Sequence, residues 1–163
     1  MATATMRTSK AALALTDVAI KSALTDVQTL ALTMYGEARG EEIEGKVAVG
    51  CVVRARVADD RWPDTYKDVC LQRWQFSCWN SIDPNAKTLL SLGESLVLTP
   101  AVPLNAILDE CLWLAQGIIS GVCRDRVRAN HYLTRTLWET APPDWAKGQS
   151  PTAFAGHHAF FLL

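Results

Sequence analysis

Apolar positions at helical spacing predict a helix that begins at Thr25 and Asp26. Both residues can cap a helix N-terminus, and the apolar residues that follow recur every three or four positions. These residues are Val27, Leu30, Ala31, Met34 and Ala38. Gly36 and Gly40 are expected to end this helix.

The stretch from Glu44 to Val57 fits two patterns. Apolar residues alternate with other residues from Val47 to Val53, as they do in a strand, yet several of them also share one face of a helix. The length of the stretch favours the helix. In contrast, the segment from Val69 to Trp79 is short, rich in aromatic residues and bounded by polar ones, and this pattern predicts a small strand region.

Two further helices follow from the second half of the chain. A turn at Asp83-Pro84-Asn85 leads into an apolar segment that Pro100 and Pro103 end. From Leu104 the apolar spacing is the clearest in the sequence, and Gly121 supplies the C-terminal stop. The tail from 129 to 163 is rich in aromatic and turn residues. We therefore expect one α+β, mainly α-helical domain over 25–163, preceded at 1–24 by an N-terminal arm or leading helix.

Composition limits the possible partners. The chain has 163 residues, enough for one compact domain without disulfides, and its net charge of −1 provides no positive field for a nucleic acid. No apolar run approaches the roughly 20 residues of a membrane-spanning helix. The basic stretch of Arg124, Arg126 and Arg128 is expected to be a solvated surface segment.

Five cysteines leave at least one thiol free if pairing is intramolecular. Cys70 with Cys78, and Cys111 with Cys123, could form disulfides in an oxidising compartment. Buried free thiols are the alternative, and the sequence leaves both open.

Glu37 is the residue best placed for acid catalysis. A free glutamate, with a pKa of about 4.3, is ionised near neutral pH and cannot donate a proton efficiently. Partial burial disfavours the charged form and can keep such an acid protonated. Glu37 lies at the edge of the apolar stripe that Leu30 and Met34 begin, so its carboxyl group is expected to point toward the core.

Several ordered blocks of the sequence resemble the SleB-type cell-wall hydrolases, a family that includes spore-cortex-lytic enzymes and related phage endolysins. The similarity spans roughly Leu30 to the C-terminus. Its blocks are Tyr35-Gly36-Glu37-Ala38-Arg39-Gly40-Glu41, Gly45 to Val49, Val52 to Val57, Trp62-Pro63, Val69-Cys70, Gln75 to Asn80, Ala129 to Tyr132, Pro143 to Ala146 and Gly156 to Phe161.

This resemblance implies a lysozyme-like or lytic-transglycosylase-like domain. It would act on the β-1,4 bond between N-acetylmuramic acid and N-acetylglucosamine in peptidoglycan, with Glu37 as the catalytic acid and no cofactor. Glu41, the second glutamate of the motif, is interpreted as structural or supporting. Expected substrate contacts are Gln75, Ser77, His131 and Tyr132, in a cleft between a helical body and the strand region. Phe76 and Trp79 are expected in the core.

The sequence departs from the family pattern at two positions. Ala55 stands where relatives usually have asparagine, which would loosen a buried hydrogen-bond network. Leu133 follows Tyr132 where phage relatives often have histidine, which would alter sugar contacts. Direct attack by water or an enzyme nucleophile needs a second carboxylate, and the candidates are Asp59, Asp60, Asp64 and Asp83. None has a persuasive context, which favours transglycosylation over hydrolysis.

Two rival functions stay open. His131, His157 and His158 allow a zinc amidase, although neighbouring side chains of a strand point to opposite faces and cannot easily share one ion. A peptidoglycan-binding or virion module would keep the fold without activity. We expect a monomeric phage lysis protein, made in the host cytoplasm without a signal peptide and acting on the wall after release.

Overall fold

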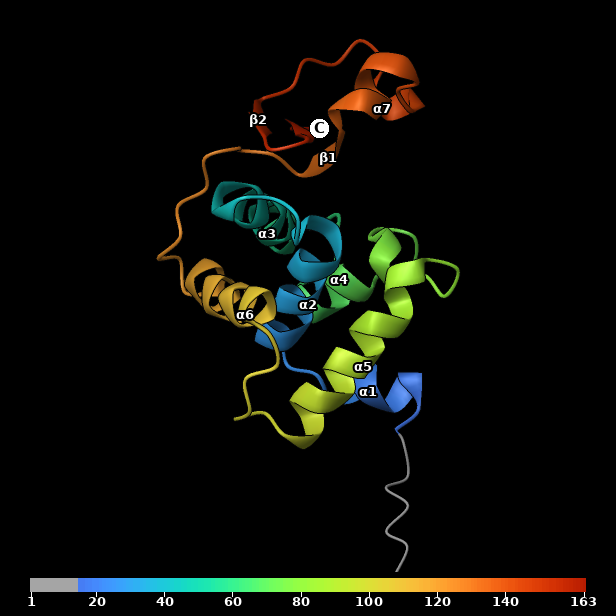
Figure 1. The fold of residues 1–163 in the computed structure, drawn as a ribbon. Helices are drawn as coiled ribbons and strands as arrows, with labels where there is room; N and C mark the ends of the chain where they lie inside the picture. Colours follow the sequence, from blue (N-terminus) through green and yellow to red (C-terminus); the bar gives the residue numbers. More distant parts are fainter. Residues whose placement is uncertain (1–14) are drawn as a thin grey trace, which may run out of the picture.

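Helix α2 is the centre of a helical body (Figure 1). The structure, a computed structural model, describes residues 15–163. Helix α2 (Asp26–Ala38) packs against α3 (Ile43–Val57), α4 (Tyr66–Leu71), α5 (Pro84–Leu98) and α6 (Ala106–Ile119). A short helix, α1 (Asp17–Ala23), packs on α5. Most of the expected N-terminal arm, residues 1–14, lies outside the described residues.

The start of α2 is fixed by a capping box. The Thr25 hydroxyl accepts a hydrogen bond from the Gln28 amide at 3.2 Å, and the Thr25 amide donates to the Gln28 side chain at 2.9 Å. The helix begins where the sequence predicts, but the expectation that Gly36 helps to end it is wrong. Gly36 lies inside α2, and a Cβ there would be 2.6 Å from the Cys78 Cβ. This glycine lets a neighbouring segment approach the helix closely.

Helix α3 confirms the helical interpretation of 44–57 and explains its ambiguity. Val53 belongs to the core cluster around α2, whereas Ala48 and Val52 pack under the C-terminal sheet. Because the helix is covered on more than one side, its apolar residues do not form a single stripe.

Helices α5 and α6 confirm the remaining helical predictions. The Asp83 side chain caps α5 and the Asn105 side chain caps α6. Gly121 follows α6 with φ +79°, a conformation that favours glycine at a helix end.

The strand region expected at 69–79 is wrong. That segment forms the end of α4 and a 3₁₀ turn, η1 (Ser77–Trp79), while Phe76 and Trp79 are buried as expected. The strands lie near the C-terminus instead: β1 (His131–Thr134), β2 (Ala153–Ala155) and β3 (His158–Phe161) form an antiparallel sheet in the order β1-β3-β2.

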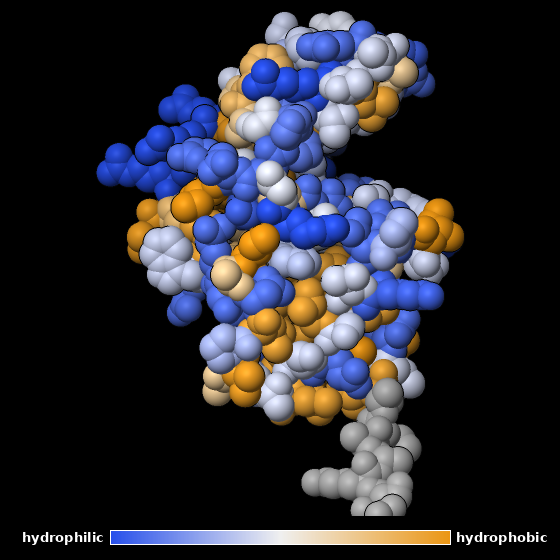
Figure 2. Space-filling view, viewed as in Figure 1, coloured by the Kyte–Doolittle hydropathy of each residue, from blue (hydrophilic) through white to orange (hydrophobic). Residues whose placement is uncertain are grey.

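The sheet lies between two layers. Phe160 of β3 packs with Ala48 and Val52 of α3, while Leu133 and Phe161 pack on the other face. That outer face is flanked by α7 (Arg135–Thr140) and by the 3₁₀ turn η2 (Asp144–Ala146). In Figure 1 the sheet and α7 form the upper part of the molecule, above α3. Figure 2 shows the surface hollowed between this part and the helical body.

Asn130 joins Leu163 to the helical body. Its side chain donates to the Leu163 carbonyl at 2.8 Å and accepts from the Leu163 amide at 2.9 Å. The buried guanidinium of Arg56, on α3, donates to the Asn130 carbonyl at 2.8 Å. Arg61 also donates to the Leu163 carbonyl, at 2.8 Å. The C-terminal sheet is thereby held to the body by polar contacts as well as by packing.

All five cysteines are free thiols, so neither possible disulfide pair forms. Four of them are buried. Within residues 15–163 there is no helix of the length and apolarity needed to cross a membrane. The architecture agrees with the expected α+β, mainly α-helical class.

Candidate active site

Glu37 lies where α2, η1 and the C-terminal sheet meet. Its Oε1 accepts a hydrogen bond from the Cys78 backbone amide at 3.1 Å, and its Oε2 accepts one from the Tyr132 hydroxyl at 2.9 Å. The side chain is half-buried. The strand beside Glu37 is β1, whereas the segment 69–79 contributes the η1 turn instead of a strand. Gly36 allows the hydrogen bond from the Cys78 amide to Glu37, because a larger residue at position 36 would push Cys78 away.

The two partners of Glu37 differ in one chemical respect. A backbone N–H can only donate, so Oε1 is an acceptor whether the carboxyl group is ionised or protonated. A tyrosine hydroxyl can donate or accept. The proton of the acid form is thus directed to Oε2, the oxygen next to Tyr132.

Tyr132 is fixed by aromatic neighbours on the sheet. Its ring stacks on Phe160 with a centroid distance of 5.7 Å and meets the edge of His158 at 5.2 Å and 88°. Burial and the nearby Glu37 carboxyl group raise the pKa of Tyr132 well above its usual value. The hydroxyl therefore stays protonated and available as a donor.

Glu41 joins the start of α3 to the turn between β2 and β3. Its side chain is 9% exposed and accepts hydrogen bonds from the His157 amide, at 3.2 Å to Oε2, and from His157 Nδ1, at 2.8 Å to Oε1. Burial acts to raise the pKa of Glu41, but the hydrogen bonds from His157 outweigh it and the net pKa is lowered. The structural interpretation of Glu41 agrees with this geometry.

The Glu41 contact requires glycine at 156. Gly156 has φ +53°, and a Cβ there would be 1.7 Å from Glu41 Oε2. His158, next along the strand, is buried, and its Nδ1 lies 3.8 Å from Glu41 Oε1 without a hydrogen-bond partner among the described residues. Burial lowers the pKa of His158, which keeps the ring neutral.

Gln75 and Ser77 are exposed on the segment that leads to Cys78. The Gln75 side chain accepts a hydrogen bond from Arg56 at 3.1 Å. The guanidinium of Arg56 also lies 5.4 Å from the centre of the Phe76 ring and 5.6 Å from that of Trp62. Arg56 thus orients this segment beside Glu37.

His131 lies on the opposite face of the sheet from Tyr132. Its ring packs against Trp145 at 5.1 Å and Trp62 at 5.9 Å, and its Nδ1 is 2.8 Å from the Asn130 side-chain oxygen. Burial, with the nearby charges of Arg56 and Arg61, lowers the pKa of His131 to about 4. The structure brings Tyr132 to Glu37 and directs His131 elsewhere. Leu133 shares the His131 side and is part of the core there.

The four aspartates considered as second carboxylates are occupied or solvated. Hydrogen bonds from Arg61 hold Asp59 ionised and lower its pKa to about 2. Asp83 caps α5, and Asp60 and Asp64 are exposed. The partners of Glu37 among the described residues, Cys78 and Tyr132, are not acidic. In the same part of the chain, no three His, Cys, Asp or Glu side chains group to hold a metal ion.

Sequence reasoning did not place Cys78, Arg56 and His158 in this neighbourhood, and it considered His158 only as a zinc ligand. The Cys78 contact uses a backbone amide, which no residue type reveals. Arg56 and His158 both lie in blocks that resemble the family, but only the fold shows that they are buried beside the Glu37 region. An arginine inside an apolar helical segment was the available signal for Arg56.

Comparison with solved structures defines the class of fold. The chain is similar to the catalytic domain of the germination-specific lytic transglycosylase SleB from Bacillus anthracis, with a TM-score of 0.57 and 25% identity over 83% of this chain and 93% of that one. It is also similar to the catalytic domain of the Bacillus cereus SleB protein, with a TM-score of 0.55 and 26% identity over 83% and 88% of the two chains. The fold is thus lysozyme-like.

Residues 40–161 match the family model described as Cell Wall Hydrolase, and the chain belongs to this family. A segment of 68 residues is 38% identical to the spore cortex-lytic enzyme of Oceanobacillus iheyensis. That segment is 38% of this chain and 24% of the relative, so the match spans about a quarter of the relative's length.

Proposed function

We propose that this chain cleaves the glycan strands of peptidoglycan at the β-1,4 bond between N-acetylmuramic acid and N-acetylglucosamine, with Glu37 as the general acid. The proposal rests on the orientation of the Glu37 carboxyl group. The Cys78 amide can only donate to it, whereas the Tyr132 hydroxyl can donate or accept. Family membership and the likeness to SleB catalytic domains support the substrate class. Glu37 itself precedes the matched range 40–161, so its role rests on geometry.

The proposed reaction begins with proton transfer from Glu37 Oε2 to the glycosidic oxygen. The bond from that oxygen to C1 of the muramic acid breaks, and the leaving sugar keeps the proton as a hydroxyl group. The Glu37 carboxylate then takes the proton of the muramic acid 6-hydroxyl, whose oxygen bonds to C1. This step forms a 1,6-anhydro product, consumes no water and restores the acid.

Among residues 15–163 the hydrogen-bond partners of Glu37 are not acidic, which favours transglycosylation over hydrolysis. Inverting and retaining hydrolases place a second carboxyl group roughly 5 to 9.5 Å from the acid. A transglycosylase needs one carboxyl group, because its substrate supplies the nucleophile. Tyr132 serves this chemistry by holding Oε2 in place in both protonation states.

Glu37→Gln tests the proposal. Glutamine keeps the size of the side chain and an oxygen for the Cys78 amide, but it cannot donate and recover a proton. We expect digestion of purified sacculi to slow by about 10²- to 10⁴-fold with an unchanged melting temperature. Equal activity of the two proteins would remove Glu37 from its role.

Mass spectrometry of the released fragments identifies the reaction. Anhydro-muramic ends are expected, whereas reducing ends would assign hydrolysis. Release of free stem peptides that stops when a chelator is added would assign the zinc amidase. Binding to sacculi without any release would assign the non-catalytic module.

The biological setting we propose is lysis of a bacterial host by a phage. The resemblance of the sequence blocks to phage endolysins supports it. The test is expression in bacteria with and without a membrane pore protein: lysis only when the pore is present is expected, and lysis in its absence would contradict release from the cytoplasm as the controlling step. Light scattering of the purified chain will test the expected monomer.

A further inference from the structure

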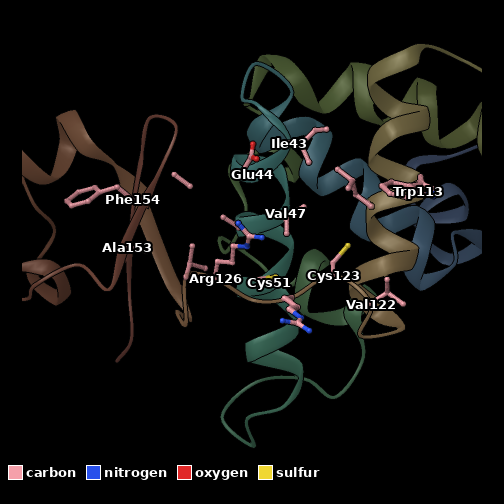
Figure 3. Close-up of a pocket in the computed structure, with 15 residues that line it drawn as sticks. Ile43, Glu44, Val47, Cys51, Trp113, Val122, Cys123, Arg126, Ala153 and Phe154 are labelled. Carbon is pink, nitrogen blue, oxygen red and sulfur yellow. The ribbon is translucent and has the colours of Figure 1, made fainter.

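A second hollow lies away from Glu37, on another side of α3. Its volume is about 570 Å³, and we call it the β2–α3 groove. Cys78 and Tyr132, the two residues that contact Glu37, do not line it. Figure 3 shows Arg126 between the hairpin that carries Ala153 and Phe154 and the helix that carries Glu44 and Val47. The groove is lined by Ile43, Glu44, Val47, Ala48, Cys51, Trp113, Leu114, Val122, Cys123, Arg124, Arg126, Val127, Ala153, Phe154 and Ala155.

Large apolar side chains are exposed around this groove. Trp113 is 73% exposed and Val122 is 79% exposed, and Phe154 and Ile43 are also exposed. Trp113 comes from α6, Ile43 from α3 and Phe154 from β2, so three elements place apolar surface at one site. Clustered exposed apolar surface beside a hollow is typical of a binding site.

Two arginines without ion-pair partners line the same groove. Arg124 and Arg126 are exposed, and neither forms a salt bridge within residues 15–163. Asp125, between them, is used internally, because its Oδ1 accepts hydrogen bonds from the amides of Val127 and Arg128 at 2.8 and 3.0 Å. The groove thus presents two free positive charges, with a single carboxylate, Glu44, on α3.

The third property of the groove is a sheet edge. Strand β2 pairs with β3 on one side, and no other strand among the described residues pairs with it. Its small residues Ala153 and Ala155 line the groove. A free strand edge can bind an extended peptide through main-chain hydrogen bonds.

We propose that the β2–α3 groove binds the stem peptide of peptidoglycan, with its carboxylates at Arg124 and Arg126 and its amino group toward Glu44. A stem peptide is short, acidic and carries small alanine side chains together with one side-chain amine. Four extended residues are roughly 13 Å long, a length suited to one strand edge. This inference rests on the proposed function, since the peptide belongs to the same polymer as the glycan.

The two sites are joined through the hairpin turn. Ala155 lines the groove, and the next residues, Gly156 and His157, contact Glu41, which lies between the end of α2, the helix that carries Glu37, and the start of α3. A glycan at Glu37 can therefore pass its stem peptide across this turn into the groove. Strands that carry peptides would then bind more tightly than bare strands.

Binding can be measured without turnover. The full chain carrying Glu37→Gln is titrated with the free tetrapeptide L-Ala-γ-D-Glu-meso-diaminopimelate-D-Ala and followed by backbone amide NMR shifts. We expect shifts at Ala153 to Ala155 and at Arg126, weakened by salt. Arg124→Glu with Arg126→Glu should lower the affinity by about tenfold. The matched control, Arg73→Glu with Lys87→Glu, changes the same charge at exposed positions outside the groove and should bind normally.

Several outcomes would overturn the inference: no shifts up to 10 mM peptide (about the weakest affinity of interest), shifts centred on Cys78 and Tyr132, or equal affinity of the double variant. Self-association that protects the groove would assign it to a second copy of the chain.

Activity is measured separately. With peptide-bearing strands the Arg124→Glu, Arg126→Glu protein should show a raised KM, and with strands freed of peptide by an amidase it should match wild type. If wild type releases no glycan fragments, the proposed function fails while the peptide-binding result stands.

Discussion

Gly156→Ala tests the contact between Glu41 and the β2–β3 turn. The added Cβ would lie 1.7 Å from Glu41 Oε2, so the carboxylate must move. The left-handed backbone, with φ +53°, itself costs alanine about 1 to 2 kcal/mol. Loss of hydrogen bonds to a charged acceptor costs about 1.5 to 3 kcal/mol, which we place at the low end because the His157 side chain is 86% exposed.

The expected loss is about 3 kcal/mol in the free energy of unfolding, or roughly 6 to 12 °C in melting temperature. Urea unfolding at constant m-value measures it. Gly40→Ala is the control, since a Cβ there meets nothing within 4 Å, and it should change stability by less than about 0.5 kcal/mol.

A double-mutant cycle separates the clash from the backbone effect. In a Glu41→Ala background, Gly156→Ala should cost only the backbone share, about 1 to 2 kcal/mol. Additive costs of the two substitutions would refute the assigned contact. A loss below about 0.5 kcal/mol for Gly156→Ala alone would refute the geometry of the turn.

Two further predictions concern Tyr132 and the histidines. Tyr132→Phe removes the hydroxyl at Glu37 Oε2 and should slow the release of anhydro fragments by about 10- to 100-fold, as expected for a hydrogen bond to a charged group, while unfolding changes little; an unchanged rate would exclude the tyrosine from the reaction. Burial holds the pKa of His131 at about 4, below its ordinary 6.5, and also lowers that of His158. The unfolded chain therefore binds protons first as pH falls, so stability is full above about 6.5 and is lost toward pH 4. Melting temperatures over this range should show the loss, and His131→Gln should reduce its slope; a slope identical to wild type would contradict the burial of that ring.

The helices were predictable because their signals are local. Thr25 and Gln28 form a cap within one turn, and Asp83 and Asn105 act in the same way. The sheet could not be predicted, because β1 ends at Thr134 and its partner β3 begins only at His158, and each strand has four residues. Such short strands exist only through pairing and packing, which a local pattern does not contain. The aromatic residues from 74 to 79 look strand-like, but Phe76 and Trp79 serve the helical core instead.

The site was predictable only in part, for the same reason. Glu37 could be found from its motif and its place on the apolar stripe. The Cys78 amide that binds it could not be predicted, because a backbone N–H is common to nearly all residue types. His131 and Tyr132 are neighbours in sequence, and once β1 is known their alternation requires that only one of them faces Glu37.

The hydrogen bonds between Asn130 and Leu163 also bear on how the protein can be engineered. A tag or fusion placed next to Leu163 would crowd the carbonyl that Asn130 and Arg61 share. Removal of Leu163 would leave both donors and the Asn130 oxygen without this partner. Handles for purification or surface attachment are therefore better placed on exposed helical positions such as Lys87.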